Sequence, residues 1–179
     1  MTAILVDATT LIALGNAGAL SLLSTFDRQI VVPRPVAAEV TTDPASTALE
    51  RAVDSGAVEV PTDRPEDGPD PMLDDARELL GDDEVNGDVA LVAGVLRRGS
   101  DSDVAVVSDD RRVRRVAEGL GAAVTGTIGV VVRGVADGRL DEEEALSLLD
   151  RLEERGLHTT ASLRTRAERL VRDAARDRE

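Results

Sequence analysis

The sequence contains no lysine, cysteine, tryptophan or tyrosine, and Phe26 is its only aromatic residue. Without cysteine, the chain cannot form disulfide frameworks, thiolate zinc sites or cysteine nucleophiles. Without aromatic side chains, it cannot bind nucleic-acid bases by stacking them on an aromatic platform. Any binding site must therefore be built from charged, small polar or aliphatic side chains.

Positive charge is also scarce. All 21 basic residues are arginine, and 35 acidic residues give a formal net charge of −14. A lysine-free acidic chain is typical of extreme halophiles, in which molar salt screens the repulsion between surface carboxylates. A GC-rich genome also favours arginine over lysine, and the two explanations are compatible. At low salt this charge argues against nucleic-acid binding, but screening in molar salt removes most of that argument.

Long hydrophobic runs are missing as well. The opening residues, MTAILVD, lack a basic segment and reach an acid after a short apolar run, which is not the pattern of a signal peptide. No window approaches the roughly 20 apolar residues of a membrane helix. We therefore expect a soluble, cytoplasmic protein with no membrane partner.

Short β-branched runs alternate with helical patterns along the 179 residues. This alternation predicts an α/β fold with a parallel sheet covered on both faces by helices. We expect a domain over residues 1–137 and a C-terminal helical extension over 138–179 packed on it. Residues 62–71, rich in acids and prolines, are expected to form an exposed loop. The strands are expected at 3–7, 29–32, 58–60, 104–107 and 122–125, and the helices at 10–23, 35–42, 46–55, 72–79, 82–97, 111–120, 126–135, 141–154 and 160–178.

Acidic residues follow two of the predicted strands, where open α/β sheets bind ligands. Asp7 ends the first strand, and Asp109 and Asp110 follow the fourth. Glu39 lies in the helix after the second strand, and Asp88 opens an otherwise apolar stretch. Ionised carboxylates beside buried surface are costly unless they are paired or bind a metal. A hard divalent ion would relieve their mutual repulsion and could activate a water for phosphodiester cleavage.

Ordinary helix capping explains the same residues. Asp7 stands before a predicted helix, and Asp109 and Asp110 stand before another, and aspartate is a favoured N-cap. From the residue pattern alone, both interpretations therefore remain open.

Four segments resemble a known family. Residues 6–14 (VDATTLIAL) are similar to Asp-Thr-Ser-Pro-Leu-Ile-x-Leu, and 32–40 (VPRPVAAEV) to Pro-x-x-Val-x-x-Glu-Val. Residues 107–117 resemble Asp-Asp-x-x-Ala-Arg-x-x-Ala, and 124–130 (VTGTIGV) match Val-Thr-Gly-Thr-Leu-Gly almost letter for letter. These patterns are those of the PIN-domain superfamily, and more narrowly of a VapC-related subgroup of predicted nucleic-acid-binding proteins. The resemblance covers about residues 4–158.

The resemblance implies a three-layer α/β/α sandwich and a Mg²⁺- or Mn²⁺-dependent endoribonuclease. An RNA substrate, an antitoxin protein and a homodimer are the partners it suggests, with a toxin of a toxin–antitoxin pair as one role. A catalytically silent scaffold that binds RNA or a protein is the alternative. The implied metal ligands and catalytic residues are Asp7, Glu39, Asp88 and Asp109, and the implied substrate-binding residues are Thr9, Arg114, Thr125 and Thr127.

Two positions depart from the subgroup. Glu84 precedes Gly87 and Asp88 where the subgroup has a Gly-Glu pair, so Glu84 is a second candidate ligand. We expect it one turn before Asp88 on the same helical face. Asp110 is likewise a lesser candidate beside Asp109.

Other chemistries lack residues that they need. A response-regulator receiver requires a lysine, and a haloacid-dehalogenase phosphatase requires an aspartate where Thr9 stands. His158, the single histidine, is expected to be structural. Of the basic cluster around 111–115, Arg114 is the expected phosphate contact, and the arginines beyond residue 160 are expected on a docked amphipathic helix.

The charge predicts salt dependence. The Debye length falls from about 10 Å at 0.1 M salt to about 3 Å at 1 M, so molar KCl confines repulsion to near neighbours. We expect circular dichroism to show folding, and the implied RNA cleavage to rise with it, between low salt and molar KCl. A protein that is fully folded and most active at 0.1 M KCl would contradict the halophile interpretation.

Overall fold

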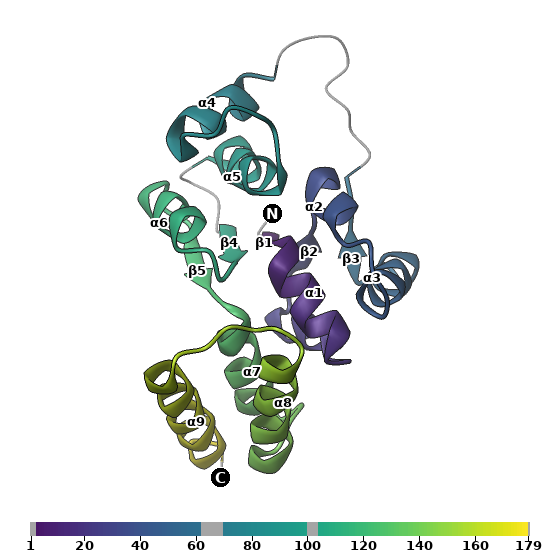
Figure 1. Ribbon diagram of the computed structural model, residues 1–179, viewed down its shortest axis with the longest axis vertical. Coiled ribbons are helices and arrows are strands. Elements are labelled where there is room, and N and C mark those ends of the chain that lie inside the picture. The colour runs from purple at the N-terminus through teal and green to yellow at the C-terminus, as the bar shows by residue number, and fades with distance from the viewer. Residues whose placement is uncertain (1–2, 62–69, 100–103, 179) are drawn as a thin grey trace.

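A computed structural model describes residues 3–61, 70–99 and 104–178 (Figure 1). Its centre is a five-stranded sheet in the order β3-β2-β1-β4-β5, with every neighbouring pair parallel. The predicted α/β class and parallel sheet are therefore confirmed. The strands are β1 (Ala3–Val6), β2 (Gln29–Val31), β3 (Val58–Glu59), β4 (Val104–Val107) and β5 (Ala123–Thr125).

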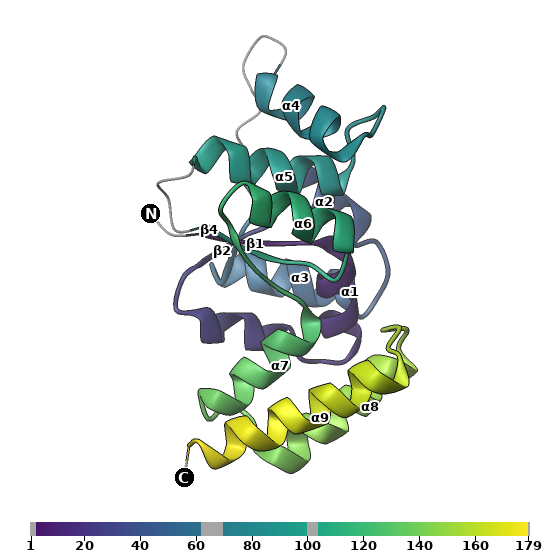
Figure 2. The ribbon, with the colours of Figure 1, turned by 90° about the vertical axis from the view of Figure 1, so that its left-hand side faces the viewer.

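Helices cover both faces of this sheet. In the edge-on view of Figure 2, α4, α5 and α6 lie on one side and α1 and α3 on the other. The helices are α1 (Ala8–Asn16), the 3₁₀ helix η1 (Leu20–Phe26), α2 (Arg34–Glu39), α3 (Ala45–Asp54), α4 (Pro71–Leu80), α5 (Gly87–Arg98), α6 (Arg111–Gly119), α7 (Thr127–Ala136), α8 (Glu142–Glu154) and α9 (Ala161–Arg176).

The order of the strands creates a switch point between β1 and β4. From β1 the chain moves outward through β2 and β3, and it then returns to the other side of β1 for β4 and β5. Val6 pairs with Val107, and the Asp7 amide donates to the Val107 carbonyl at 3.0 Å. The residues that follow the two strands are therefore neighbours at the carboxyl edge, where such sheets bind ligands.

The core consists of aliphatic side chains from the sheet and its helices. All four residues of β1 are buried, and α5 buries seven consecutive apolar residues from Val89 to Val95. Strands buried on both faces are expected to be apolar throughout, which explains why β1 shows no alternation. No helix among the described residues is long and apolar enough to cross a membrane.

The C-terminal helices add a further layer. α8 begins with a capping box in which Asp141 and Glu144 satisfy each other's backbone amides. α9 packs on α7 and α8, as Figure 2 shows, and buries Ala167 and Val171. The predicted docked helix is thus present, although its Leu163 and Leu170 are 40% and 38% exposed.

Several predicted boundaries were wrong. The stretch 10–23 is not one helix, because α1 ends at Asn16 and Gly18 adopts a left-handed φ of 70° before η1. The helix predicted from 82 begins at Gly87, because the Asn86 side chain caps it by accepting from the Val89 amide. Of the predicted loop at 62–71, residues 62–69 lie outside the described residues.

Close packing of α1 on α3 generates a stability prediction. A Cβ at Gly15 would stand 2.7 Å from the Ala45 Cα, which is backbone and cannot turn away. We expect Gly15→Ala to destabilise the protein by about 1–3 kcal/mol, measured by urea unfolding in molar KCl. The control is Gly119→Ala at the end of α6, where nothing lies within 4 Å. Equal stabilities for the two variants would contradict this account of the α1–α3 contact.

Candidate active site at the carboxyl edge of the sheet

Asp7 stands directly after β1 and caps α1. Its side chain is 5% exposed, and its Oδ1 accepts from the Thr10 amide at 2.7 Å. Burial raises the pKa of this carboxyl above its ordinary value, whereas hydrogen bonds from Ser108 and Thr10 act in the opposite direction. The negative charge of Asp109 raises the pKa further. The protein therefore holds a carboxylate where ionisation is unfavourable, a frequent property of functional groups.

Asp109 contacts the start of α7. Its Oδ1 accepts from the Thr127 amide at 3.0 Å, and its Oδ2 accepts from the Thr127 hydroxyl at 2.5 Å. Thr127 is fully buried. Through these two contacts Asp109 caps a helix whose own N-cap residue, Gly126, has no side chain to do so.

The geometry around Asp109 explains the segment Thr-Gly-Thr-Ile-Gly. A Cβ at Gly126 would lie 2.3 Å from Asp109 Oδ1, so a side chain there would displace the carboxylate. A Cβ at Gly129 would lie 1.9 Å from the Thr125 hydroxyl oxygen. Both glycines thus leave room for oxygen atoms at the start of α7, which gives this motif a physical reason.

Buried hydroxyls connect the two aspartates. The Thr127 hydroxyl oxygen lies 3.3 Å from that of Thr10, and the Thr10 side chain in turn contacts Asp7. Ser108, also fully buried, contacts Asp7 and accepts from the Asp110 amide at 3.1 Å. We call Asp7, Thr10, Ser108, Asp109 and Thr127 the aspartate–hydroxyl network.

Thr10 and Ser108 were not predicted as site residues. The predicted Thr9 is exposed on α1, whereas Thr10 is completely buried. Helix geometry could have indicated Thr10, because the third residue of a helix donates its amide to the N-cap side chain. Ser108, directly before Asp109, carries no comparable pattern.

Glu39 contacts the start of α5, one residue before Asp88. Glu39, the last residue of α2, accepts through Oε1 from the Gly87 amide at 2.8 Å, and it remains exposed. A Cβ at Gly87 would lie 2.5 Å from that oxygen. Asp88 is the next residue, in the first turn of α5. The glycine thus permits a carboxylate from α2 to reach α5 beside a second acid.

Asp88 is partly desolvated and paired. Burial raises its pKa above the ordinary value, an effect opposed by a hydrogen bond from Arg112. The negative charges of Asp110 and Asp82 raise its pKa as well. The Asp88 Oδ2 to Arg112 Nη2 distance is 3.2 Å.

The two lesser candidates occupy different positions. Glu84 is exposed and lies before the Asn86 cap, so the expectation that it shares a helical face with Asp88 was wrong. Asp110 caps α6, and its Oδ1 accepts from the amides of Arg112 and Val113 at 2.7 and 3.0 Å.

Four helices therefore begin at this edge with an acid at their first turn. Asp7, Glu39, Asp110 and Asp109 accept amides of α1, α5, α6 and α7 respectively. The positive ends of the helix dipoles favour these charges. Each of the strand-end acids Asp7, Asp109 and Asp110 thus caps a helix, and Asp109 caps α7 and not the helix α6 that follows it in the chain.

The donors suit a hard divalent ion, since they are carboxylate oxygens with hydroxyls behind them. As the side chains lie, however, no three acids within residues 3–61, 70–99 and 104–178 form a group that could hold one ion. Helix amides and Arg112 take up the carboxylates instead. The carboxylate oxygens of these acids are suitable ligands for a divalent metal ion. Their side chains would have to rotate before three of them could bind the same ion.

The basic residues of α6 differ in what they reach. Arg114, the predicted phosphate contact, is half-buried and forms no ion pair with another described residue. Arg112, its neighbour two positions earlier, reaches both Asp82 and Asp88. The sequence pattern did not single out Arg112.

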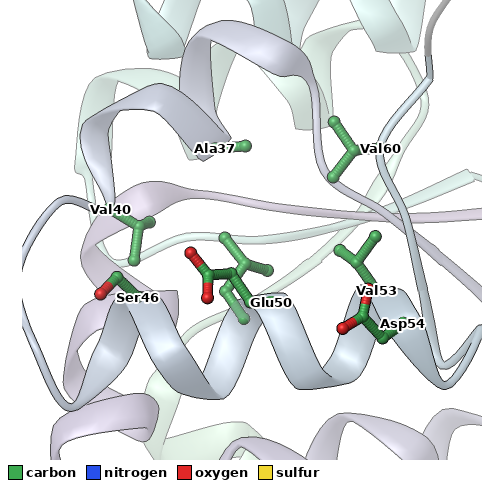
Figure 3. A pocket seen from close by; sticks show the side chains of 8 residues that line it. Ala37, Val40, Ser46, Glu50, Val53, Asp54 and Val60 are labelled. Carbon is green, nitrogen blue, oxygen red and sulfur yellow. The ribbon is translucent and has the colours of Figure 1, made fainter.

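A groove of about 390 Å³ lies elsewhere, between α2, α3 and the end of β3 (Figure 3). Ala37, Val40 and Val60 face α3, which contributes Val53 and the acids Glu50 and Asp54. The acids of the aspartate–hydroxyl network do not line it. The groove is thus a second surface feature, apolar with an acidic side.

A family model described as a PIN domain matches residues 3–173, which includes α8 and most of α9. No curated protein matches the chain. The match spans nearly the whole sequence and agrees with the parallel sheet and its switch point. The chain belongs to the PIN-domain family.

Proposed function

We propose that this protein is a metal-dependent endoribonuclease that hydrolyses phosphodiester bonds in single-stranded RNA. The observation that carries the proposal is the aspartate–hydroxyl network at the switch point of the sheet. There a buried carboxylate with a raised pKa lies beside a second carboxylate, and hydroxyls orient both. Membership of the PIN-domain family supports a nuclease-type fold.

Asp7, Glu39, Asp88 and Asp109 would hold Mg²⁺ or Mn²⁺. Their carboxylate oxygens are the donors that these ions prefer. When bound, the ion supplies an activated water and stabilises the leaving oxygen. It would also offset the negative charges that, together with burial, raise the pKa of Asp7 and of Asp88 in the metal-free protein.

The remaining residues of the site would position these acids and the RNA. The hydroxyls of Thr10, Ser108 and Thr127 restrict Asp7 and Asp109 to defined orientations. Arg114 and Thr9 reach solvent near the same edge and would contact phosphate oxygens. Because the chain has only one aromatic residue, the RNA would be held by its backbone and not by stacked bases.

The groove between α2 and α3 favours a second candidate function, binding of a protein partner. Its apolar floor and the acids Glu50 and Asp54 suit an amphipathic helix with basic residues. A toxin bound by an antitoxin would combine RNA cleavage with binding of a protein partner. A catalytically silent scaffold would only bind the partner. Metal binding separates the two, because a silent scaffold has no need of Mn²⁺ affinity.

The nuclease proposal predicts loss of cleavage on loss of one ligand charge. We expect Asp109→Asn to lower the cleavage rate of single-stranded RNA about a hundredfold or more, and EDTA to abolish cleavage. The Asn oxygen can still accept the Thr127 amide, so the fold should survive. Cleavage is followed on a labelled RNA with Mn²⁺ in molar KCl.

Asp75→Asn is the matched control, because Asp75 is exposed on α4 and the charge change is the same. It should cut as fast as the unmodified protein. Equal rates for Asp109→Asn and Asp75→Asn, both folded, would refute the assignment of this site.

The raised pKa of Asp7 predicts that its charge costs stability. A carboxyl whose pKa is higher in the folded than in the unfolded state destabilises the fold above that folded pKa, and this cost disappears as the pH falls through it. We therefore expect Asp7→Asn to raise the Tm of the metal-free protein at neutral pH. Each kcal/mol gained corresponds to about 2–4 °C.

Asparagine caps helices about as well as aspartate, so the α1 cap should persist. The gain should shrink in a melting series taken in EDTA from pH 7 towards pH 3. A gain that is constant over this range would mean that ionisation of Asp7 is not its source.

A further inference from the structure

Arg112 forms the most extensive ion pair at the site. Its Nη1 lies 2.7 Å from Asp82 Oδ1 and 3.2 Å from the Leu80 carbonyl. Its Nη2 lies 3.1 Å from Asp82 Oδ2 and 3.2 Å from Asp88 Oδ2. The guanidinium is thus bidentate on Asp82, and its other two contacts are the Leu80 carbonyl and Asp88, a geometry that arginine alone provides.

The loop between α4 and α5 is built to hold this guanidinium. Gly81, directly after α4, adopts a left-handed conformation with φ 70°. The Leu80 carbonyl and the Asp82 carboxylate on either side of it both accept from Arg112 Nη1. The side-chain amide nitrogen of Asn86 donates to Asp82 Oδ2 at 3.2 Å. The side-chain oxygen of Asn86 accepts from the Val89 backbone amide and so caps α5. Asp82 is therefore fixed relative to the helix that carries Asp88.

Asp88 lies among negative charges that a neighbouring cation would offset. The negative charges of Asp82 and Asp110 act on the partly desolvated Asp88. Arg112 is the positive charge that offsets them. Its guanidinium places a positive charge against a carboxylate oxygen of Asp88, as a divalent ion bound there would.

We propose that Arg112 is an internal cation that holds Asp88 in the metal-free protein and competes with the divalent ion for this carboxylate. The inference rests on the proposed function, since it takes Asp88 to be a metal ligand. It makes Arg112 a positioning residue. Asp82 keeps the guanidinium docked when Asp88 turns to the ion. The pairing with Arg112 accounts for the position of Asp88, whereas helix amides hold the other three acids, so that no three acids among the described residues form one group.

The test measures Mn²⁺ affinity of the full chain by isothermal titration calorimetry in molar KCl, without RNA. Arg112→Gln should bind Mn²⁺ roughly five- to tenfold more tightly, because the competing cation is gone. Arg111→Gln is the control: Arg111 is exposed, precedes Arg112 on α6, and loses the same charge. Molar salt screens the long-range effect of losing the Arg111 charge, so the Mn²⁺ affinity of Arg111→Gln should stay close to that of the unmodified protein.

A second measurement separates competition from an ordinary structural ion pair. In EDTA, Arg112→Gln should melt below Arg111→Gln, because Asp88 is left among like charges. Saturating Mn²⁺ should close this gap, since the ion replaces the lost cation. Adding Asp88→Asn to Arg112→Gln should remove the gain in affinity. If Arg112→Gln fails to fold, Arg112→Lys keeps the charge without the fork and should show a smaller gain.

The outcomes are distinct. Equal Mn²⁺ affinities for Arg112→Gln and Arg111→Gln, or a melting gap that persists with Mn²⁺, would overturn the competition while leaving the nuclease proposal intact. No Mn²⁺ binding to the unmodified protein would overturn both. Tighter binding only in Arg112→Gln, lost again with Asp88→Asn, supports the inference.

Discussion

The parallel pairing of β1 with β4 determines what this protein can do. It aligns Val6 with Val107, so Asp7 and Asp109 emerge at one edge even though they are far apart in the chain. The helices α1 and α7 begin at the same edge, and their backbone amides donate to Asp7 and Asp109 respectively. Any different register would separate the two carboxylates and leave helix ends uncapped. Fold stability and site geometry therefore depend on the same backbone contact.

Much of this arrangement is predictable because it follows the backbone. Short apolar runs between helical patterns predicted the five strands, and the acids at strand ends followed from their order. The break at Gly18 and the cap at Asn86 were missed, since a left-handed glycine and a side-chain cap are local events within otherwise helical patterns. The contacts of Arg112 with Asp82 were also missed, because residues 30 positions apart meet only through tertiary packing.

Small residues matter at this site as much as acids do. Gly87 and Gly126 each stand where a Cβ would come within 2.5 Å of a carboxylate oxygen, of Glu39 and Asp109 respectively. A helix can accept a carboxylate from another element at its N-terminus only if its first residues leave space. The specificity of the Thr-Gly-Thr segment as a sequence pattern thus has a steric origin, independent of any bound ion.

Capping and metal binding are not exclusive explanations of the same acids. Caps hold Asp7, Glu39 and Asp109 in place and offset part of their charge. Burial still raises the pKa of Asp7, and it also raises that of Asp88, which pairs with Arg112. Helix amides bind Asp7, Glu39 and Asp109, whereas Asp88 is paired with a side chain, that of Arg112. Of the four proposed ligands, Asp88 is therefore the one that a divalent ion could bind without competing with a helix amide, and its competitor there is Arg112. Under the proposed function, a change at Arg112 would adjust metal affinity without disturbing a helix cap.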